Sequence, residues 1–140
     1  MEDITIRFDS WSTKSPTLYS HYSGLGALAA AVRAVKDMQS DKLSNTHEPG
    51  EYLFTLCNLL GEGNYCNGYS IYNYSKYDRE DCTCEYGLWV CDIKTGLWFN
   101  SKAGLLPRPP LTNKEVLQHI RAESGHDVFL KMYKLLEESE

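Results

Sequence analysis

The sequence predicts an α+β fold, with a mixed or antiparallel sheet of about five strands, two central helices on one face of the sheet, and C-terminal helices after a proline-rich connector. Short alternating or apolar runs at residues 4–8 and 86–100 are typical of strands. Apolar side chains at residues 23–40 and 48–60 recur at the spacing of amphipathic helices. A length of 140 residues is that of a single domain.

The chain is expected to open with a β-hairpin. Apolar and polar side chains alternate through residues 4–8, and turn-forming residues at 9–16 separate this run from a second strand at 17–21. Successive strand side chains project to opposite faces, so we expect Tyr19 and His21 to share one face of the sheet.

Two helices should follow the hairpin. Ser23 is a candidate N-cap for the first, an alanine-rich helix that ends near residues 38–40. The second is expected over residues 48–60, with Thr46 as its cap and Pro49 in its first turn.

The middle of the chain supplies the remaining strands. A tyrosine-rich stretch has an expected strand at residues 68–74, and it serves either as a packed edge of the core or as a recognition surface. A second hairpin joins residues 86–93 to 97–100 through Lys94, Thr95 and Gly96, where glycine suits a left-handed turn position.

The C-terminal part begins with a connector at residues 106–110, in which three prolines fix φ and remove backbone donors. Thr112 and Glu115 have the spacing of a capping box, ahead of one broken helix or two short ones. We therefore divide the single domain into an α+β core at residues 1–105 and a connector with a helical appendage at 106–140.

Charge and hydropathy exclude some classes of function. A net charge of -5 disfavours binding to duplex nucleic acid, which draws its affinity from Lys and Arg. Apolar runs fall short of the roughly 18 residues that span a bilayer, and the first residues lack the pattern of an export signal. We expect a cytoplasmic protein, in the host cell if it is phage-encoded, that does not bind membranes.

The five cysteines indicate reduced thiols, because their number is odd and no export signal precedes them. Cys82 and Cys84 stand closer together than the thiolates of a usual zinc knuckle, and no second close pair follows. We therefore expect neither a metal site nor a cofactor.

The main functional prediction concerns the start of the alanine-rich helix. Amide hydrogens at a helix N-terminus are positively polarised, and glycine lets an anion approach them closely. We expect a phosphate to bind at Ser23, Gly24 and Gly26 with His21 in contact, while a base stacks on the tyrosine-rich strand. The candidate ligand-binding residues are Tyr19, His21, Ser23, Gly24, Gly26, Tyr69 and Tyr72.

Familiar catalytic motifs are missing from the sequence, including the phosphate-binding loop, the dinucleotide fingerprint and the nucleophile elbow. Ser20 and His21 are expected on opposite faces of a strand, which prevents a direct nucleophile–base pair. We assign no catalytic residue and consider three functions. The preferred one is a non-catalytic binding protein that sequesters a small anionic ligand, for which a cyclic nucleotide immune signal is the natural candidate. The alternatives are a metal-independent nucleotide phosphodiesterase that uses His21 and an inhibitor that binds a host defence protein.

The run Leu-Tyr-Ser-His-Tyr-Ser-Gly at residues 18–24 lies between a strand pair and the alanine-rich helix. With the hairpin around residues 94–96, it resembles small uncharacterised proteins of bacteriophages and prokaryotes. Small phage proteins of this kind are similar in style to anti-defence proteins, which sequester a cyclic or modified nucleotide signal or block a defence protein. We also expect a homo-oligomer, since small ligand-capturing proteins often complete their pocket at a symmetric interface.

Overall fold

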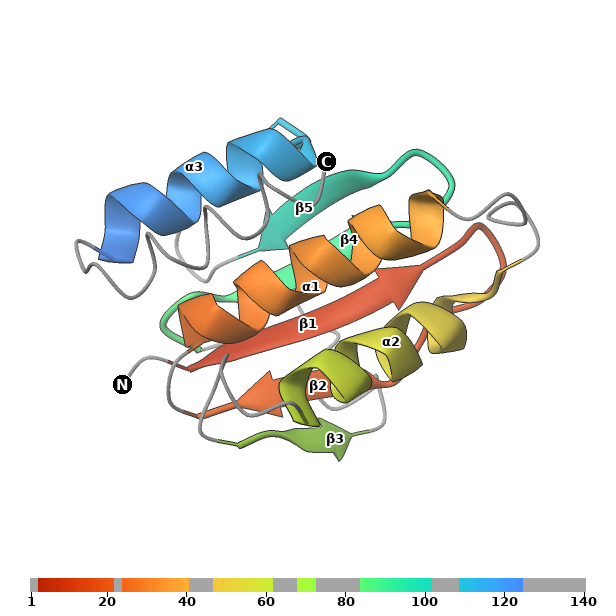
Figure 1. The fold of residues 1–140 in the computed structure, drawn as a ribbon, viewed down its shortest axis with the longest axis horizontal. Coiled ribbons are helices and arrows are strands. Elements are labelled where there is room, and N and C mark those ends of the chain that lie inside the picture. Colours follow the sequence, from red (N-terminus) through yellow and green to blue (C-terminus); the bar gives the residue numbers. More distant parts are fainter. Residues whose placement is uncertain are drawn as a thin grey trace.

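The computed structural model describes residues 3–21, 24–40, 47–61, 68–72, 84–101 and 109–124. Figure 1 shows a sheet with helices packed against it, so the predicted α+β class is confirmed. In chain order the elements are β1 (Ile4–Asp9), β2 (Thr17–Ser20), α1 (Gly24–Gln39), α2 (Pro49–Gly61), β3 (Ser70–Tyr72), β4 (Leu88–Asp92), β5 (Leu97–Ser101) and α3 (Asn113–Ser124).

The strands form one mixed sheet in the order β3-β2-β1-β4-β5. The central strand β1 pairs antiparallel with β2 and parallel with β4, while β2–β3 and β4–β5 pair antiparallel. Both predicted hairpins are therefore present. In the described chain β3 spans residues 70–72, and the last two positions of the predicted strand lie outside the described residues.

The described helices all cover the same face of the sheet, and α1 lies between α2 and α3 (Figure 1). Almost every residue of α1 up to Val35 is buried. Alanine accounts for this position, because its small side chain lets a helix backbone pack closely against a strand and two neighbouring helices at once. The expected cap of α1, Ser23, lies outside the described residues.

The core lies between the sheet and this helix layer. Ile4, Ile6 and Phe8 project from β1 toward the helices and are fully buried. The Phe8 ring packs against Tyr52 of α2 with 5.8 Å between ring centroids, and against Trp98 of β5 at 6.1 Å. Large aromatic side chains thus link α2 to the central strand β1, and β1 to β5.

The second helix begins close to its predicted position, with Pro49 as its first residue. The predicted cap, Thr46, lies outside the described residues. The Glu51 carboxylate accepts the Glu48 N–H at 3.3 Å and lies 2.6 Å from His47 Nδ1. The hydrogen bond from His47 lowers the pKa of Glu51. The first turn of α2 is therefore capped by its own acidic side chain.

Two local predictions near the C-terminal half are also confirmed. Thr112 and Glu115 form the capping box of α3, in which Thr112 N–H donates to Glu115 Oε1 at 3.0 Å and Glu115 N–H donates to Thr112 Oγ1 at 3.2 Å. In the β4–β5 turn, Gly96 has a φ of 76° and its N–H donates to the Asp92 carbonyl at 2.7 Å.

The described part of the predicted appendage packs on the core. Leu111 and Trp98 exchange two backbone hydrogen bonds, of 2.7 and 2.8 Å, and α3 lies against α1 and β5. Residues 102–108 and 125–140 lie outside the described chain. Among the described helices, none combines the length and the apolar character needed to cross a membrane.

Candidate functional site

The sheet separates the predicted site residues into two groups. The register places Tyr19 opposite Thr5 on one side and Ser70 on the other, and it places Tyr72 opposite Thr17. By alternation these side chains project from the face opposite α1, α2 and α3, which we call the second face of the sheet.

Tyr19, His21 and Tyr72 form a cluster, named here the Tyr19 cluster. The Tyr19 hydroxyl oxygen lies 2.8 Å from His21 Nδ1. The Tyr19 and Tyr72 rings meet edge to face with 6.3 Å between centroids, and the His21 ring lies 6.1 Å from that of Tyr19. All three side chains are half-buried. The cluster combines an imidazole, which can donate or accept a hydrogen bond, with aromatic rings that can contact a planar ligand.

Asp3 supports this cluster and was not among the predicted site residues. Its backbone carbonyl accepts the Tyr86 N–H at 3.0 Å, its Oδ1 accepts the Glu85 N–H at 2.7 Å, and its Oδ2 accepts the Tyr19 O–H at 3.4 Å. One signal in the sequence could have found it, because Asp3 precedes Thr5 by two residues and alternation places both on the second face.

Gly24 and Gly26 lie in the first turn of α1, within the helix layer, and both are buried along with Leu25 and Ala27. The first four amides of an α-helix have no partner inside the helix, and in α1 they belong to these buried residues. His21 precedes Gly24 by three residues, so their Cα atoms lie within about 11 Å of each other. The chain thus keeps His21 near the helix start without exposing the two glycines.

Tyr69 lies apart from the Tyr19 cluster. It stands three residues before Tyr72, and its side chain hydrogen-bonds the Cys57 thiol of α2, on the helix side of the sheet. Burial raises the pKa of the Cys57 thiol, and the hydrogen bond from Tyr69 offsets part of that rise. The structure therefore brings together Tyr19, His21 and Tyr72 and places Tyr69 elsewhere.

In the part of the chain that the structure describes, no three His, Cys, Asp or Glu side chains are grouped so that they could hold a metal ion. Cys57 and Cys91 are free thiols. Cys66 and Cys82 lie outside the described residues. The expectation that Cys82 and Cys84 do not form a zinc site therefore stays a prediction.

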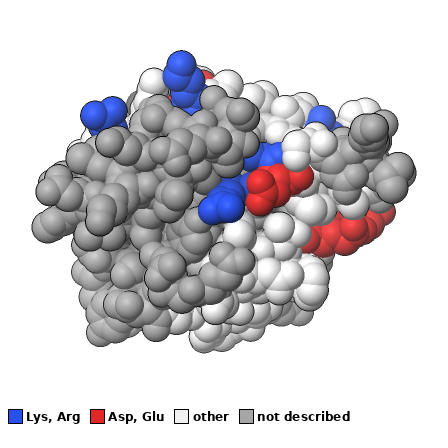
Figure 2. All heavy atoms as spheres, in the orientation of Figure 1, with Lys and Arg blue, Asp and Glu red and all other residues white. Residues whose placement is uncertain are grey.

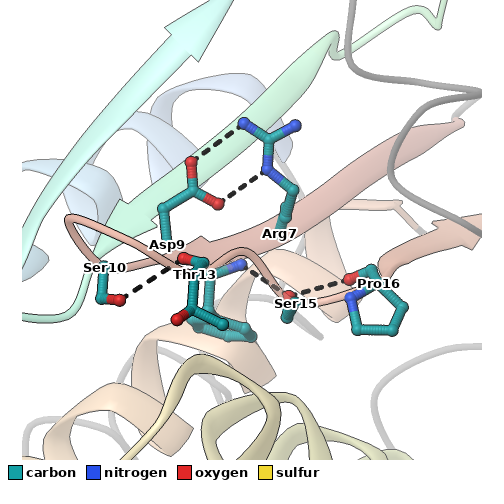
Figure 3. A network of polar contacts seen from close by, with 7 residues as sticks. Arg7, Asp9, Ser10, Thr13, Ser15 and Pro16 are labelled. Atoms are coloured by element: carbon teal, nitrogen blue, oxygen red, sulfur yellow. Dashed lines mark hydrogen bonds and ion pairs between the residues drawn. The ribbon is translucent and has the colours of Figure 1, made fainter.

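The β1–β2 turn is a second surface feature, and its tip presents Trp11 with 91% of its surface exposed. Figure 3 shows the polar contacts that hold this turn. Ser10 N–H donates to the Thr13 carbonyl at 2.8 Å, and Ser15 N–H donates to the Phe8 carbonyl at 2.8 Å. Ser15 Oγ accepts the Phe8 N–H at 3.0 Å. The most exposed large apolar side chain of the described residues is therefore carried by a turn that several hydrogen bonds hold.

A partly buried ion pair lies at the base of the same turn. Arg7 Nε donates to Asp9 Oδ1 at 2.8 Å and Arg7 Nη2 donates to Asp9 Oδ2 at 3.0 Å, as Figure 3 shows. The Arg7 side chain is only 6% exposed. A bidentate contact of this kind fixes both side chains, so it stiffens the end of β1 next to the β1–β2 turn, which we call the Trp11 turn.

The charged side chains on the helix-bearing face are a third surface feature. Figure 2 shows the helix-bearing face, on which the described Lys and Arg side chains stand apart from one another. Arg33 of α1 pairs with Asp37 of the same helix at 3.9 Å. Duplex binding needs a continuous run of basic side chains, which the described residues on this face do not form.

A fold does not by itself determine a function, and the surface features of this chain that could bind a partner are the Tyr19 cluster with Asp3 and the turn that carries Trp11. A scan against protein-family models, a search of curated proteins and a search of solved structures found no match to this chain.

Proposed function

We propose that this chain is a non-catalytic binding protein that holds a small anionic ligand, a cyclic nucleotide signal, at the Tyr19 cluster. The observation that carries the proposal is the 2.8 Å contact between the Tyr19 hydroxyl and His21 Nδ1, made beside the edge-to-face ring of Tyr72. A phosphate can accept a hydrogen bond from the imidazole while the base contacts the tyrosine rings. Phosphate recognition and base recognition then share one small surface.

The position of the anionic group follows from burial. Gly24 and Gly26 are buried in the helix layer, whereas His21 is half-buried on the second face. We therefore place the phosphate against His21, close to the helix start along the chain, and not between the two glycines. A chain with a net charge of -5 can still bind an anion, because a local donor decides the potential at the site.

The proposal keeps three expectations from the sequence. The protein acts in the cytoplasm, it belongs among phage anti-defence proteins, and it works as a homo-oligomer. Sedimentation equilibrium measures the oligomeric state. A monomer at micromolar concentration would contradict the homo-oligomer.

The experiment is a retention assay. Purified protein is incubated with the cyclic mononucleotides and cyclic dinucleotides of adenine and guanine, desalted and heated, and the released compound is identified by mass spectrometry. Intact nucleotide supports a binding protein. A cleaved product contradicts it and indicates the alternative, a metal-independent phosphodiesterase with His21 as general acid or base. Failure to retain any of these nucleotides also contradicts the proposal.

Variants connect the assay to the site. His21→Ala removes the hydrogen bond to the phosphate and should lower the affinity at least about tenfold, as expected for a hydrogen bond to a charged group. His47→Ala is the matched control, because His47 contacts Glu51 at the start of α2 and takes no part in the Tyr19 cluster. Equal losses in both variants would contradict the assigned site.

A second candidate function is inhibition of a host defence protein, and Trp11 favours it. Tryptophan is enriched among residues that dominate binding energy at protein interfaces, and an ordered turn loses little entropy on binding. Phage plating on a strain that carries the defence system separates the two candidates. Loss of protection in Trp11→Ala alone supports an inhibitor, and loss in His21→Ala alone supports nucleotide binding.

A further inference from the structure

Apolar side chains gather at the edge of the molecule formed by β3 and α2. Among the described residues, the exposed large hydrophobic side chains are Trp11, Phe54, Tyr69, Ile71 and Phe99. Three of these five belong to α2, to β3 or to the residue before β3, namely Phe54, Ile71 and Tyr69. We call these three side chains the β3 edge patch. Trp11 belongs to the Trp11 turn and Phe99 to β5, so neither is part of the patch.

The β3 edge patch lies on the helix-bearing side of the sheet. Ile71 is the register partner of Leu18, which is buried under the helices, so both side chains project toward the helix layer. Tyr69 precedes Ile71 by two residues, and its side chain hydrogen-bonds the Cys57 thiol of α2. Phe54 lies one turn before Cys57 on the same side of that helix. The patch therefore extends from the strand to the neighbouring side of α2.

The two edges of the sheet differ in what covers them. At the β5 edge, Trp98 and Leu111 exchange backbone hydrogen bonds of 2.7 and 2.8 Å, and α3 lies against β5. At the opposite edge β3 is the outermost strand of the described sheet (Figure 1), and Ser70 and Ile71 are exposed. Residues 68–72 contain neither proline nor a charged residue, which are features that keep an edge strand from pairing with another chain. The β3 edge is therefore suited to accept a further strand.

Charge favours a second copy of this chain as the source of that strand. Each copy has a net charge of -5, so two copies repel each other over most of their surfaces. The repulsion is weakest where charged side chains are sparse. Glu51 is the only charged residue of α2, and it pairs with His47 at 2.6 Å. Since residues 68–72 add no charge, two acidic chains can meet at this edge.

The geometry of β3 also suits pairing with itself. Two identical strands that pair antiparallel are related by a two-fold axis perpendicular to the sheet, which keeps the helices of both copies on the same face. With the axis at Ile71, the middle residue of β3, the two Ile71 side chains lie opposite each other on the helix side. Each Ser70 then lies opposite Tyr72 of the other copy. The two β3 edge patches meet across the axis.

We propose that β3 pairs antiparallel with β3 of a second copy, so that two five-stranded sheets join into one and the β3 edge patches pack together. The inference rests on the homo-oligomer of the proposed function and gives it an interface. Tyr72 belongs both to β3 and to the Tyr19 cluster, so the proposed nucleotide site lies beside this interface. Pairing of the strands does not itself require a nucleotide.

The first test is sedimentation equilibrium of the full chain without ligand at micromolar concentrations. The wild type should be a dimer. Ile71→Lys should raise the dissociation constant of the dimer about a hundredfold or more, because symmetry brings two like charges together at the axis. Phe99→Lys is the matched control, since Phe99 is also 43% exposed but lies on β5, and it should remain a dimer. A monomeric wild type, or equal dissociation constants in the two variants, overturns the inference.

Disulfide crosslinking tests the pairing without adding a charge, and it stands even if the lysine at residue 71 is not tolerated. Directly opposite residues of antiparallel strands have Cα atoms about 4.5–5.5 Å apart, a distance that a disulfide spans. Ile71→Cys should therefore form a covalent dimer on mild oxidation, with residue 71 of both chains identified by peptide mass spectrometry. Phe99→Cys, which keeps the same native cysteines, measures the background. Crosslinking of Ile71→Cys no greater than this background overturns the antiparallel pairing.

These experiments and the retention assay distinguish a failed interface from a failed function. A dimer that depends on Ile71 but retains no nucleotide contradicts the proposed function and supports the interface. A chain that retains an intact nucleotide and stays monomeric overturns the interface and supports the binding protein.

Discussion

Burial of Cys91 predicts that the protein loses stability in alkaline solution. Cys91 lies on β4 in the core and is fully inaccessible to solvent. Burial raises the pKa of its thiol far above the ordinary value of 9.0, and the nearby carboxylates of Asp92 and Asp9 add to the rise. Above pH 9 the unfolded chain therefore releases a proton that the folded chain keeps, so rising pH favours unfolding.

The size of the stability loss follows from the single proton that Cys91 releases on unfolding. The free energy of unfolding should fall by about 1.4 kcal/mol for each pH unit above 9, which is about 3 kcal/mol by pH 11. Burial also raises the pKa of Tyr52, whose ordinary value is 10.0, and this adds to the loss at the upper end of the range. Total stabilities of domains are about 5–15 kcal/mol, so the loss is a large fraction of the whole.

Urea unfolding followed by tryptophan fluorescence between pH 7 and 11 measures this gradient. Cys91→Ala should start with lower stability at pH 7, because it leaves a small cavity, and should then lose stability more slowly as pH rises. Cys57→Ala is the matched control, since Cys57 is only partly buried and should contribute a smaller gradient. Equal gradients in wild type and Cys91→Ala would refute the argument from the buried thiol.

Three further predictions concern the described fold. Gly96→Ala should lower the free energy of unfolding by about 1–2 kcal/mol, because φ is 76° there and a side chain is strained in that conformation. The added Cβ would meet only the end of the exposed Gln39 side chain, which can move away. Gly61→Ala, whose added Cβ meets nothing within 4 Å, should not lower stability in this way. Urea midpoints compare the pair, and similar losses would contradict the role of the turn. Thr112→Ala should lower the free energy of unfolding by about 1 kcal/mol, because it removes the α3 capping box, and Thr112→Gly should lower it by only a few tenths. Thermal unfolding compares the two variants, and a greater loss in Thr112→Gly would contradict the role of the cap. Trp11→Ala should leave stability within about 0.5 kcal/mol of wild type, since the side chain is 91% exposed, and a larger loss in the same thermal assay would show that Trp11 packs against the fold.

Local signals in the sequence were enough to predict most of the elements. Alternation from Ile4 to Phe8, the Thr112–Glu115 spacing and the glycine at residue 96 each depend on a few neighbouring residues, and each element is present. The strand order could not be predicted in this way. β1 pairs with β4, and the Thr5 hydroxyl donates to the carbonyl of Gly87, 82 residues later in the chain, which depends on packing across the whole domain.

The same difference between local patterns and tertiary packing applies to the candidate site. Tyr19 and His21 were expected on one face because they are two residues apart, and their 2.8 Å contact places them together. The same argument applied to Tyr69 and Tyr72, three residues apart, would have placed them on opposite faces. Asp3 contacts the Tyr19 hydroxyl, and alternation with Thr5 indicates only the face on which it lies. The Glu85 and Tyr86 N–H groups that hold Asp3 come from a distant segment, and no local pattern indicates those contacts. The burial of the first turn of α1 likewise depends on tertiary packing that a helix-start motif does not contain.

The most direct measurement of the central claim is a titration of isotopically labelled protein with the best-retained cyclic nucleotide, followed through the ring resonances of tyrosine and histidine. Binding at the Tyr19 cluster should shift the rings of Tyr19, His21 and Tyr72 in proportion to occupancy and leave His119, which packs against Trp89, unchanged. A nucleotide that binds and leaves those three rings unshifted would contradict the account.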